Sequence, residues 1–320
     1  GVELFVLDDG WFGKRNNDTC SLGDWKVNYN KLPSGIDGLA EKINKIGMKF
    51  GLWFEPEMIS PDSDLYREHP DWAIHIDERE GVQSRNQMVL DLSRDEVCEY
   101  VINAVSDILA NANIEYVKWD MNRQLTDMPR LGYNHEYTLG YYKIMSAITE
   151  KFPNILFEGC SAGGGRFDAG VLAYMPQIWT SDNSDAIARL KMQYSTSMCY
   201  PVYSISSHVT ASPNHQCGRV TSLKTRADVA YCGTFGYELD VTKMSDEEFE
   251  EIKAQIEFEK RIQDLMCNGD LYRLINPYET NYCSWEVVSK DKKHIFVMAC
   301  KVLAVAQKTK ISKRAVISPT

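Results

Sequence analysis

Long apolar runs and an excess of positive charge are both missing from this sequence. No stretch of about 18 apolar residues occurs, so we predict no transmembrane helix. The chain has 45 acidic residues against 35 basic ones, and its formal net charge is -10. Nucleic acids and anionic membranes are themselves negative and repel such a chain. The sequence therefore predicts no nucleic acid and no membrane as its main partner.

Cysteine and histidine occur without the spacing of a metal or redox site. The nine cysteines are scattered and odd in number, and no two are spaced as C-x-x-C. The six histidines include no H-E-x-x-H or other tight ligand cluster. We predict free thiols, packed mostly as small apolar side chains in a reducing cytoplasm, and no metal site.

Strand-like and helix-like segments alternate along most of the chain. About eight such units over roughly 250 residues predict an α/β protein with a (β/α)8 TIM barrel. A doubly wound open sheet is the alternative, but no G-x-G-x-x-G follows the first expected strand. The expected barrel strands are residues 2–7, 50–54, 88–92, 114–119, 155–160, 178–181, 202–206 and 233–239.

The pattern changes after about residue 270, where short strands separated by turns replace the alternation. Residues 272–275, 283–289 and 294–303 are the expected strands, and they predict the start of a small antiparallel β domain. We therefore divide the chain into a catalytic barrel, residues 1–268, and a partial C-terminal β-sandwich domain, residues 269–320.

One expected strand ends in an unusual group of polar residues. The apolar run from Ile114 to Val117 is followed by Lys118, Trp119 and Asp120. In a barrel the carboxyl ends of the strands and the loops after them build the active site, so we place Asp120 in a pocket. Lys118 lies two positions earlier on the same face of the strand, where its charge would keep the carboxylate ionised.

Carboxylates and tryptophans also follow the other expected strands. Tryptophan faces stack on sugar rings, and carboxylates accept hydrogen bonds from sugar hydroxyls. Glycoside hydrolysis needs an ionised nucleophile and a protonated acid, and Asp120 and Asp182 suit these two roles. We expect apolar surroundings and the like charge of Asp185 to keep Asp182 protonated. The remaining strand-end candidates are Asp8, Asp9, Trp11, Trp53, Glu55, Glu57, Arg85, Asn122, Glu158, Cys160 and Trp179.

Each carboxylate also has a plainer interpretation. Asp8 and Asp9 would cap the following loop, Glu55 and Glu57 would be solvated loop charges, and Asp120 would form a buried ion pair with Lys118 or Arg123. We interpret Asp91 as structural and Asp185 as the N-cap of a helix from Ala186. The glycine run at residues 163–165 lacks the lysine of a phosphate-binding loop, and it indicates a tight turn or backbone close to a ligand.

Five separate motifs, in order along residues 1–305, resemble those of the bacterial α-galactosidases of glycoside hydrolase family 36. They are DDGW at residues 8–11, GLWFEPE at 51–57, KWDMNR at 118–123, CSAGGGRFD at 160–168 and WTSDNSDA at 179–186. The resemblance implies a retaining (β/α)8 enzyme that needs no metal or cofactor.

The resemblance also implies roles for individual residues. Asp120 would be the nucleophile and Asp182 the general acid/base, about 5–6 Å apart as in a retaining pair. Asp8 and Asp9 would bind galactose hydroxyls, including the axial one. Trp53, Arg85, Lys118 and Cys160 would line the same subsite, with Asn122 and Gly163 nearby.

The implied activity is hydrolysis of terminal α-galactose from melibiose and raffinose-type oligosaccharides in the cytoplasm. Three alternatives stay open: a preference for α-linked N-acetylgalactosamine, galactosyl transfer, and a truncated barrel that binds sugar without turnover. Family members carry an N-terminal β-sandwich domain, which often contributes to oligomer contacts, and a complete C-terminal one. The chain opens at Gly1 without a methionine or a basic leader. We therefore expect a region upstream of it, further strands after it and a homo-oligomer.

Overall fold

A computed structural model describes residues 1–79 and 81–303 of the chain. Within these residues, seven parallel strands form one sheet in the order β1-β2-β5-β6-β7-β8-β9. The sheet curves as half of a barrel, with β1 and β9 at its two edges, and this confirms the predicted α/β class. Its strands are β1 (Leu4–Leu7), β2 (Lys49–Phe54), β5 (Tyr116–Trp119), β6 (Leu156–Gly159), β7 (Gln177–Trp179), β8 (Ile205–Thr210) and β9 (Thr234–Glu238).

Strand β2 explains why these segments become a parallel sheet. Its residues from Phe50 to Phe54 are all buried, as expected of a strand that is covered on both faces. It pairs in parallel with β1 on one side and with β5 on the other. Parallel pairing brings the carboxyl ends of the strands to one edge, and the polar residues that follow each strand meet there.

The prediction of a barrel strand at residues 88–92 is wrong. Only the first two of these residues form a strand, β4 (Met88–Val89). This strand pairs antiparallel with β3 (Met58–Ile59) in a separate two-stranded sheet. As a result β2 and β5 are direct neighbours in the main sheet. Asp91 is structural, as interpreted: its Oδ1 accepts hydrogen bonds from the hydroxyls of Ser93 and Tyr133, both at 2.6 Å.

The expected strand at residues 202–206 also shifts along the chain. Residues Val202–Ser204 form a 3₁₀ helix, and β8 begins only at Ile205. The other 3₁₀ helices of the described chain are Pro70–Trp72 and Val241–Lys243.

The helices bury one face against the sheet or against each other. In α3, the predicted stripe of Val97, Val101, Val105 and Leu109 is buried. The predicted capping box of Ser245 and Glu248 opens α8, where both of its hydrogen bonds are present. The helices are α1 (Gly35–Lys45), α2 (Asp64–Glu68), α3 (Asp95–Ala110), α4 (Tyr133–Lys151), α5 (Ala169–Leu172), α6 (Ala186–Thr196), α7 (Leu223–Ala230) and α8 (Asp246–Asn268). None of them combines the length and the apolar character that a bilayer crossing requires.

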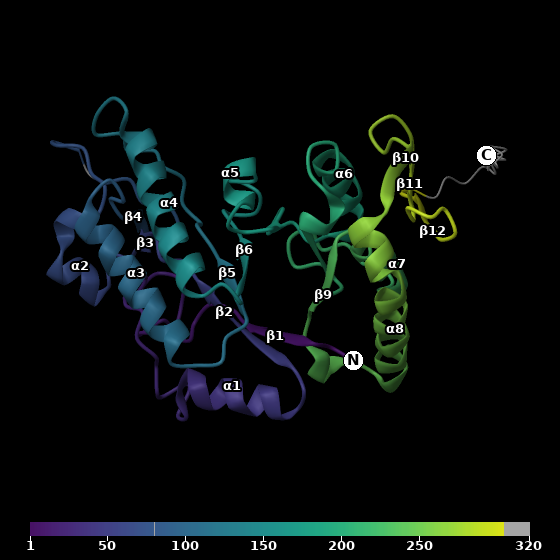
Figure 1. Ribbon diagram of the computed structural model, residues 1–320, viewed down its shortest axis with the longest axis horizontal. Helices are drawn as coiled ribbons and strands as arrows, with labels where there is room; N and C mark the ends of the chain where they lie inside the picture. Colours follow the sequence, from purple (N-terminus) through teal and green to yellow (C-terminus); the bar gives the residue numbers. More distant parts are fainter. Residues whose placement is uncertain (80, 304–320) are drawn as a thin grey trace.

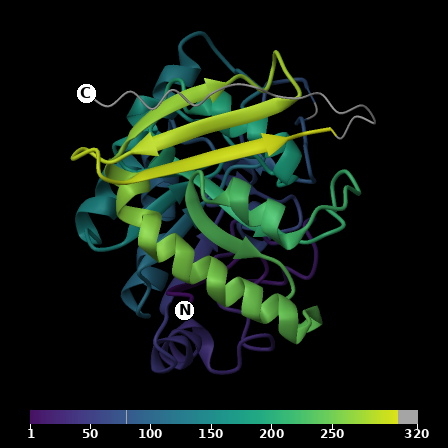
Figure 2. The ribbon, with the colours of Figure 1, turned by 90° about the vertical axis from the view of Figure 1, so that its right-hand side faces the viewer.

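The predicted antiparallel strands follow α8. They are β10 (Asp270–Ile275), β11 (Tyr282–Val288) and β12 (Ile295–Lys301), and they pair in this order. Trp285 and Met298 on this sheet share a buried apolar cluster with Leu190 of α6. Figure 2 shows the three strands lying across the molecule above α8. The division at residue 268 stays a prediction, and the expected C-terminal continuation beyond residue 303 lies outside the described residues.

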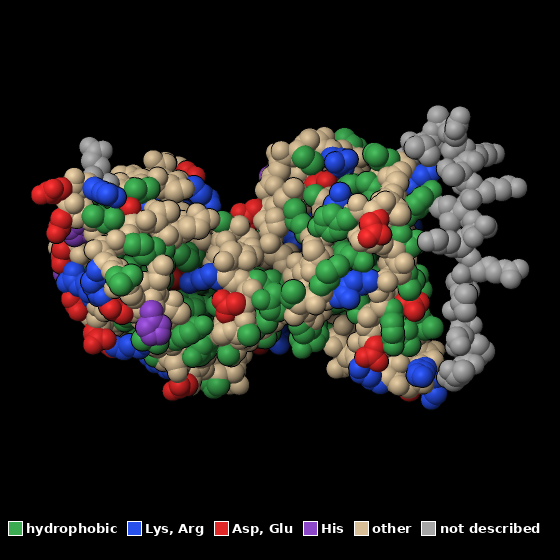
Figure 3. All heavy atoms as spheres, turned by 90° about the horizontal axis from the view of Figure 1, so that it is seen from above, with side chains coloured by type: hydrophobic (Ala, Val, Ile, Leu, Met, Phe, Trp, Pro, Cys, Tyr) green, Lys and Arg blue, Asp and Glu red, His purple; other side chains and the backbone are tan. Residues whose placement is uncertain are grey.

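The apolar core is divided along the molecule. One large cluster joins buried side chains from Trp11 to Ile178, whereas two smaller clusters join residues from Ala186 to Met298. Figure 1 shows α2, α3 and α4 at one end and α6, α7 and α8 at the other, with β1, β2, β5 and β6 between them. Figure 3 shows the corresponding waist between two lobes. The candidate residues follow strands of both parts.

Candidate active site

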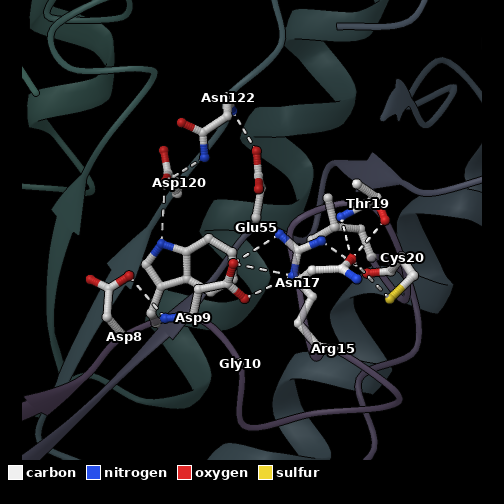
Figure 4. Close-up of polar contacts among 12 residues, drawn as sticks. Asp8, Asp9, Gly10, Arg15, Asn17, Thr19, Cys20, Glu55, Asp120 and Asn122 are labelled. Carbon is white, nitrogen blue, oxygen red and sulfur yellow. Dashed lines mark hydrogen bonds and ion pairs between the residues drawn. The ribbon is translucent and has the colours of Figure 1, made fainter. Parts of the chain in front are cut away.

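Asp120 follows β5 directly and is held by three N–H donors. The backbone amide of Met121 donates to Oδ1 at 2.8 Å. Oδ2 accepts from Nδ2 of Asn122 at 2.7 Å and from Nε1 of Trp53 at 3.2 Å. The side chains of Asp120 and Asn122 point toward one another in Figure 4. Since the residue is only 6% exposed, these donors fix the orientation of the carboxylate.

Lys118 does not hold Asp120, which corrects the prediction from strand spacing. Its Nζ binds Oδ2 of Asp8 at 2.8 Å, across the sheet at the end of β1. Burial lowers the pKa of Lys118, but the negative charges of Asp8 and Glu158 outweigh this effect and leave that pKa raised. Arg123 does not pair with Asp120 either, because its Nη2 lies 3.4 Å from Oδ2 of Asp127. The alternative interpretation of Asp120 as half of a buried ion pair with Lys118 or Arg123 is therefore wrong.

Asp9 is oriented by an arginine that the sequence reasoning missed. Nη2 of Arg15 binds Oδ2 of Asp9 at 2.8 Å, and Nε of Arg15 binds Oδ1 at 3.0 Å. Nη1 of the same buried arginine donates to the carbonyl of Cys20 at 2.9 Å, so the loop and the strand end are tied together (Figure 4). Arg15 lies in a polar loop without periodicity, and no sequence signal pointed to it.

Glu55 is buried beside Asp120, so its interpretation as a solvated loop charge is wrong. It is 1% exposed, and its Oε1 accepts a hydrogen bond from the backbone amide of Asn122. The pKa of the Glu55 carboxyl is raised to about 8, first by burial and then by the negative charge of Asp120. The charge of Arg85 acts in the opposite direction, which places this exposed arginine within electrostatic reach of the site.

Glu57 is fully buried and joins four parts of the structure. It pairs with Arg166, whose Nη1 and Nη2 lie 2.9 and 2.7 Å from its two oxygens. Nε1 of Trp119 donates to it at 2.8 Å and the hydroxyl of Tyr137 at 2.7 Å. The loops after β2 and β6, the end of β5 and helix α4 are therefore linked through this one carboxylate.

Asp182 lies three residues beyond the end of β7. Its Oδ1 accepts a hydrogen bond from Nε1 of Trp179 at 2.9 Å, and the residue is exposed. Asp185 caps α6, as interpreted: its Oδ2 accepts from the amide of Ala188 at 3.0 Å and pairs with Arg219 at 3.1 Å. The charge of Asp185 is thus paired with Arg219 at the start of α6.

The glycine run after β6 packs against the segment before Asp182. Gly163 has a φ of +90°, and a Cβ built on it would lie 2.8 Å from Cα of Ser181. The amide of Gly164 donates to the carbonyl of Thr180 at 2.9 Å. The prediction was either a tight turn or backbone close to a ligand; the positive φ of Gly163 fits a turn, and the backbone that these glycines approach is this protein segment.

Cys160 follows β6 directly and lies beside Asp120. The pKa of its buried thiol is raised well above the ordinary value, first by desolvation and then by the Asp120 charge. The thiol therefore stays neutral and packs beside the carboxylate.

The structure thus gathers two groups of predicted residues at the carboxyl edge of the sheet. Trp53, Cys160 and Asn122 surround Asp120, while Lys118 and Asp8 are paired beside Asp9. Within residues 1–79 and 81–303, no three His, Cys, Asp or Glu side chains are grouped to hold a metal ion. Carboxylates following β5 and β7 are able to serve as nucleophile and proton donor across a glycosidic bond. Their predicted separation of about 5–6 Å stays a prediction.

Comparison with known families decides where the chain belongs. The model of the melibiase family matches residues 1–269. The chain belongs to the melibiase family. It is 54% identical over 314 residues to α-galactosidase AgaA of Geobacillus stearothermophilus. It is 48% identical over 324 residues to α-galactosidase Mel36A of Lactobacillus acidophilus. These alignments cover 96% and 98% of the chain, but only 43% and 44% of the relatives.

Solved structures of GH36 α-galactosidases have the same fold. The crystal structure of AgaA matches with a TM-score of 0.94 at 53% identity, over 96% of this chain and 44% of that one. A variant of AgaA in complex with raffinose matches with a TM-score of 0.95, again at 53% identity, over 97% of this chain and 44% of that one. The chain therefore spans less than half the length of these proteins.

Proposed function

We propose that this chain is the catalytic part of a retaining α-galactosidase, which releases terminal α-D-galactose from melibiose and raffinose-family oligosaccharides. The observation that carries the proposal is the Asp120 carboxylate, which is buried at the end of β5 and oriented by three N–H donors. Close relatives are named α-galactosidases, and variants of one of them have been crystallised with raffinose and with stachyose.

In this proposal, Asp120 and Asp182 divide the reaction between them. An oxygen of Asp120 attacks the anomeric carbon while the carboxyl of Asp182 protonates the leaving glycosidic oxygen. Water then attacks the galactosyl-enzyme, Asp182 takes its proton, and the Asp120 carboxylate is released. Two inversions at one carbon retain the α configuration. Of the two, Asp182 is the exposed group, so it is accessible to both the leaving group and the incoming water.

The other predicted residues build the galactose subsite in this proposal. Asp8 and Asp9 accept hydrogen bonds from sugar hydroxyls, and their orientation is maintained by Lys118 and Arg15. The remaining residues of the subsite are Trp53, Arg85, Asn122, Cys160 and Gly163.

Replacement of the nucleophile tests the proposal. In the intact protein, Asp120→Ala is expected to lower turnover of an aryl α-galactoside by roughly 10⁴-fold or more, because no carboxylate remains to form the covalent intermediate. Added azide or formate restores part of the turnover, since a small anion replaces the missing carboxylate.

The matched control is Asp228→Ala, which removes an aspartate of α7 whose ion pair with Lys224 is on the surface. It is expected to keep wild-type turnover. Near-normal activity of Asp120→Ala would refute the nucleophile assignment. Galactose binding in calorimetry, without any turnover by the wild-type protein, would instead favour a sugar-binding barrel. Faster cleavage of aryl α-N-acetylgalactosaminides would favour the alternative substrate.

Location and assembly are part of the same proposal. All nine cysteines lie in the described residues as thiols, and five of them are buried, which supports a reducing cytoplasm as the compartment. We also propose a homo-oligomer of the intact protein, and its molar mass by light scattering tests this directly.

A further inference from the structure

Arg189 is a buried arginine on α6 that donates hydrogen bonds to the backbone on both sides of Asp182. It is 3% exposed. Its Nη2 donates to the carbonyl of Ser181 at 2.6 Å, and its Nε donates to the carbonyl of Asn183 at 3.0 Å. These are the residues immediately before and after Asp182. One rigid guanidinium therefore fixes the backbone of Asp182 from both neighbours.

The same guanidinium contacts two further parts of the sheet. Its Nη1 donates to Oγ1 of Thr180 at 2.6 Å and to the carbonyl of Ser206 on β8 at 3.2 Å. The segment after β7 is thereby anchored to the neighbouring strand β8. These acceptors are three carbonyls and one hydroxyl, so the bonds serve to hold the backbone.

Trp179 provides a second connection between Arg189 and Asp182. The guanidinium carbon lies 4.5 Å from the centre of the indole ring, a distance typical of cation–π contacts. The ring of His208 lies 4.7 Å from the same indole. With its ring in contact with both side chains, Trp179 directs its Nε1–H to Oδ1 of Asp182 at 2.9 Å.

Burial of this arginine carries an energetic cost. Desolvation lowers the pKa of Arg189 to about 10, although the charges of Glu238 and Asp182 act in the opposite direction. The side chain stays protonated at neutral pH, so a full positive charge is buried among neutral acceptors. Such a charge is costly unless its hydrogen bonds are satisfied, and here three of its four hydrogen bonds go to residues 180–183.

We propose that Arg189 is a positioning residue for Asp182, which it holds through the carbonyls of Ser181 and Asn183 and through the ring of Trp179. The inference rests on the proposed function, in which Asp182 is the general acid/base. Lysine cannot replace this arginine, because an ammonium group lacks the planar fork that reaches several acceptors and stacks on an indole.

The test is the dependence of turnover on the leaving group in Arg189→Lys. Melibiose has a poor leaving group that needs protonation, whereas 2,4-dinitrophenyl α-galactoside does not. A misplaced acid is expected to lower kcat/KM for melibiose by about 10²-fold and kcat/KM for the activated substrate by less than about threefold, because kcat/KM reports the step that forms the galactosyl-enzyme. A merely structural role would lower both equally, because it would reduce the amount of folded enzyme.

Asp182→Ala separates this inference from the function on which it rests. It should show the same selective loss on melibiose, and Arg189→Lys should add less than about threefold in the Asp182→Ala background. Equal losses on both substrates in Asp182→Ala would overturn the acid role and the positioning role together. A selective loss in Asp182→Ala with an equal loss in Arg189→Lys would overturn the positioning role alone.

Arg226→Lys is the matched control. Arg226 is also buried, its Nη1 donates to the carbonyl of Thr210, and desolvation lowers its pKa as well. Any loss in this variant is expected to be equal on the two substrates. If Arg189→Lys fails to fold by circular dichroism, Trp179→Phe replaces it as the test. That variant removes the N–H donor to Asp182 and replaces the indole with a smaller ring, and it should lower kcat/KM for melibiose about tenfold more than kcat/KM for the activated substrate.

Discussion

Replacing Glu55 with glutamine should change how the stability of this protein depends on pH. The carboxyl is buried beside Asp120, and its pKa is raised from 4.5 to about 8. Between these pH values the folded state binds the Glu55 proton more tightly than the unfolded chain does. The free energy of unfolding therefore falls as pH rises through this window. Glutamine carries no titratable proton, so the unfolding free energy of Glu55→Gln does not include this contribution to the decline with pH.

The expected size follows from the two pKa values. One pKa unit corresponds to about 1.4 kcal/mol, so the rise of about 3.5 units from 4.5 to 8 is equivalent to about 5 kcal/mol over the whole window. Roughly 3 kcal/mol of this belongs to the interval between pH 5 and pH 8. The unfolding free energy of Glu55→Gln should therefore decline by roughly 3 kcal/mol less than that of the wild type across that interval.

Urea unfolding at pH 5, 6.5 and 8 measures how far the unfolding free energy of the wild type and of Glu55→Gln declines. The difference between the two declines removes the contributions of the titrating groups that both proteins share. Glu257→Gln serves as the control, because Glu257 is exposed on α8, and its decline should match that of the wild type. Parallel curves for wild type and Glu55→Gln would refute the reasoning. They would mean that Glu55 is already ionised at pH 5 in the folded protein.

Two further predictions concern the support of the site. Glu57→Gln leaves Arg166 without its carboxylate partner and should lower the free energy of urea unfolding by about 3 kcal/mol; a loss below about 1 kcal/mol would contradict the role of Glu57. Gly163→Ala places a Cβ 2.8 Å from Cα of Ser181, so it should destabilise the protein by about 1–3 kcal/mol more than Gly47→Ala and lower kcat for melibiose. Gly47 is the matched control because its φ of +88° is similar and nothing lies within 4 Å of its Cβ position, and equal effects of the two variants would refute the contact argument.

Most strands of the fold were predictable because a buried parallel strand is a short, nearly continuous apolar run. Residues 50–54 were expected and form β2, and residues 233–239 contain β9. Residues 88–92 have the same apolar character, but they pair with β3 outside the main sheet. The pattern of one segment does not state which segment it pairs with, and this is why the expected third barrel strand was wrong.

The candidate site was predictable to the extent that it follows from strand ends. Asp8, Trp53, Asp120 and Cys160 come together because parallel strands bring their carboxyl ends to one edge. The partner of Lys118 was not predictable, since spacing along β5 favoured Asp120 whereas the long side chain reaches Asp8 on β1. The burial of Glu55 and Glu57 was not predictable either, because the residues around Pro56 are equally typical of an exposed loop.

The order of apolar runs and helical stripes along the chain by itself determined the α/β class, the position of the polar residues at strand ends and the caps of α6 and α8. These features depend on neighbours within a few positions, so a linear pattern contains them. Only the tertiary structure decided the partners of the charged groups. Arg15 binds Asp9, Arg166 binds Glu57, and Arg189 binds the backbone around Asp182. Arg166 and Glu57 are 109 positions apart, whereas Arg15 and Arg189 reach residues six to eight positions away across a loop; none of these contacts follows a helix or strand period, so the sequence pattern does not contain them.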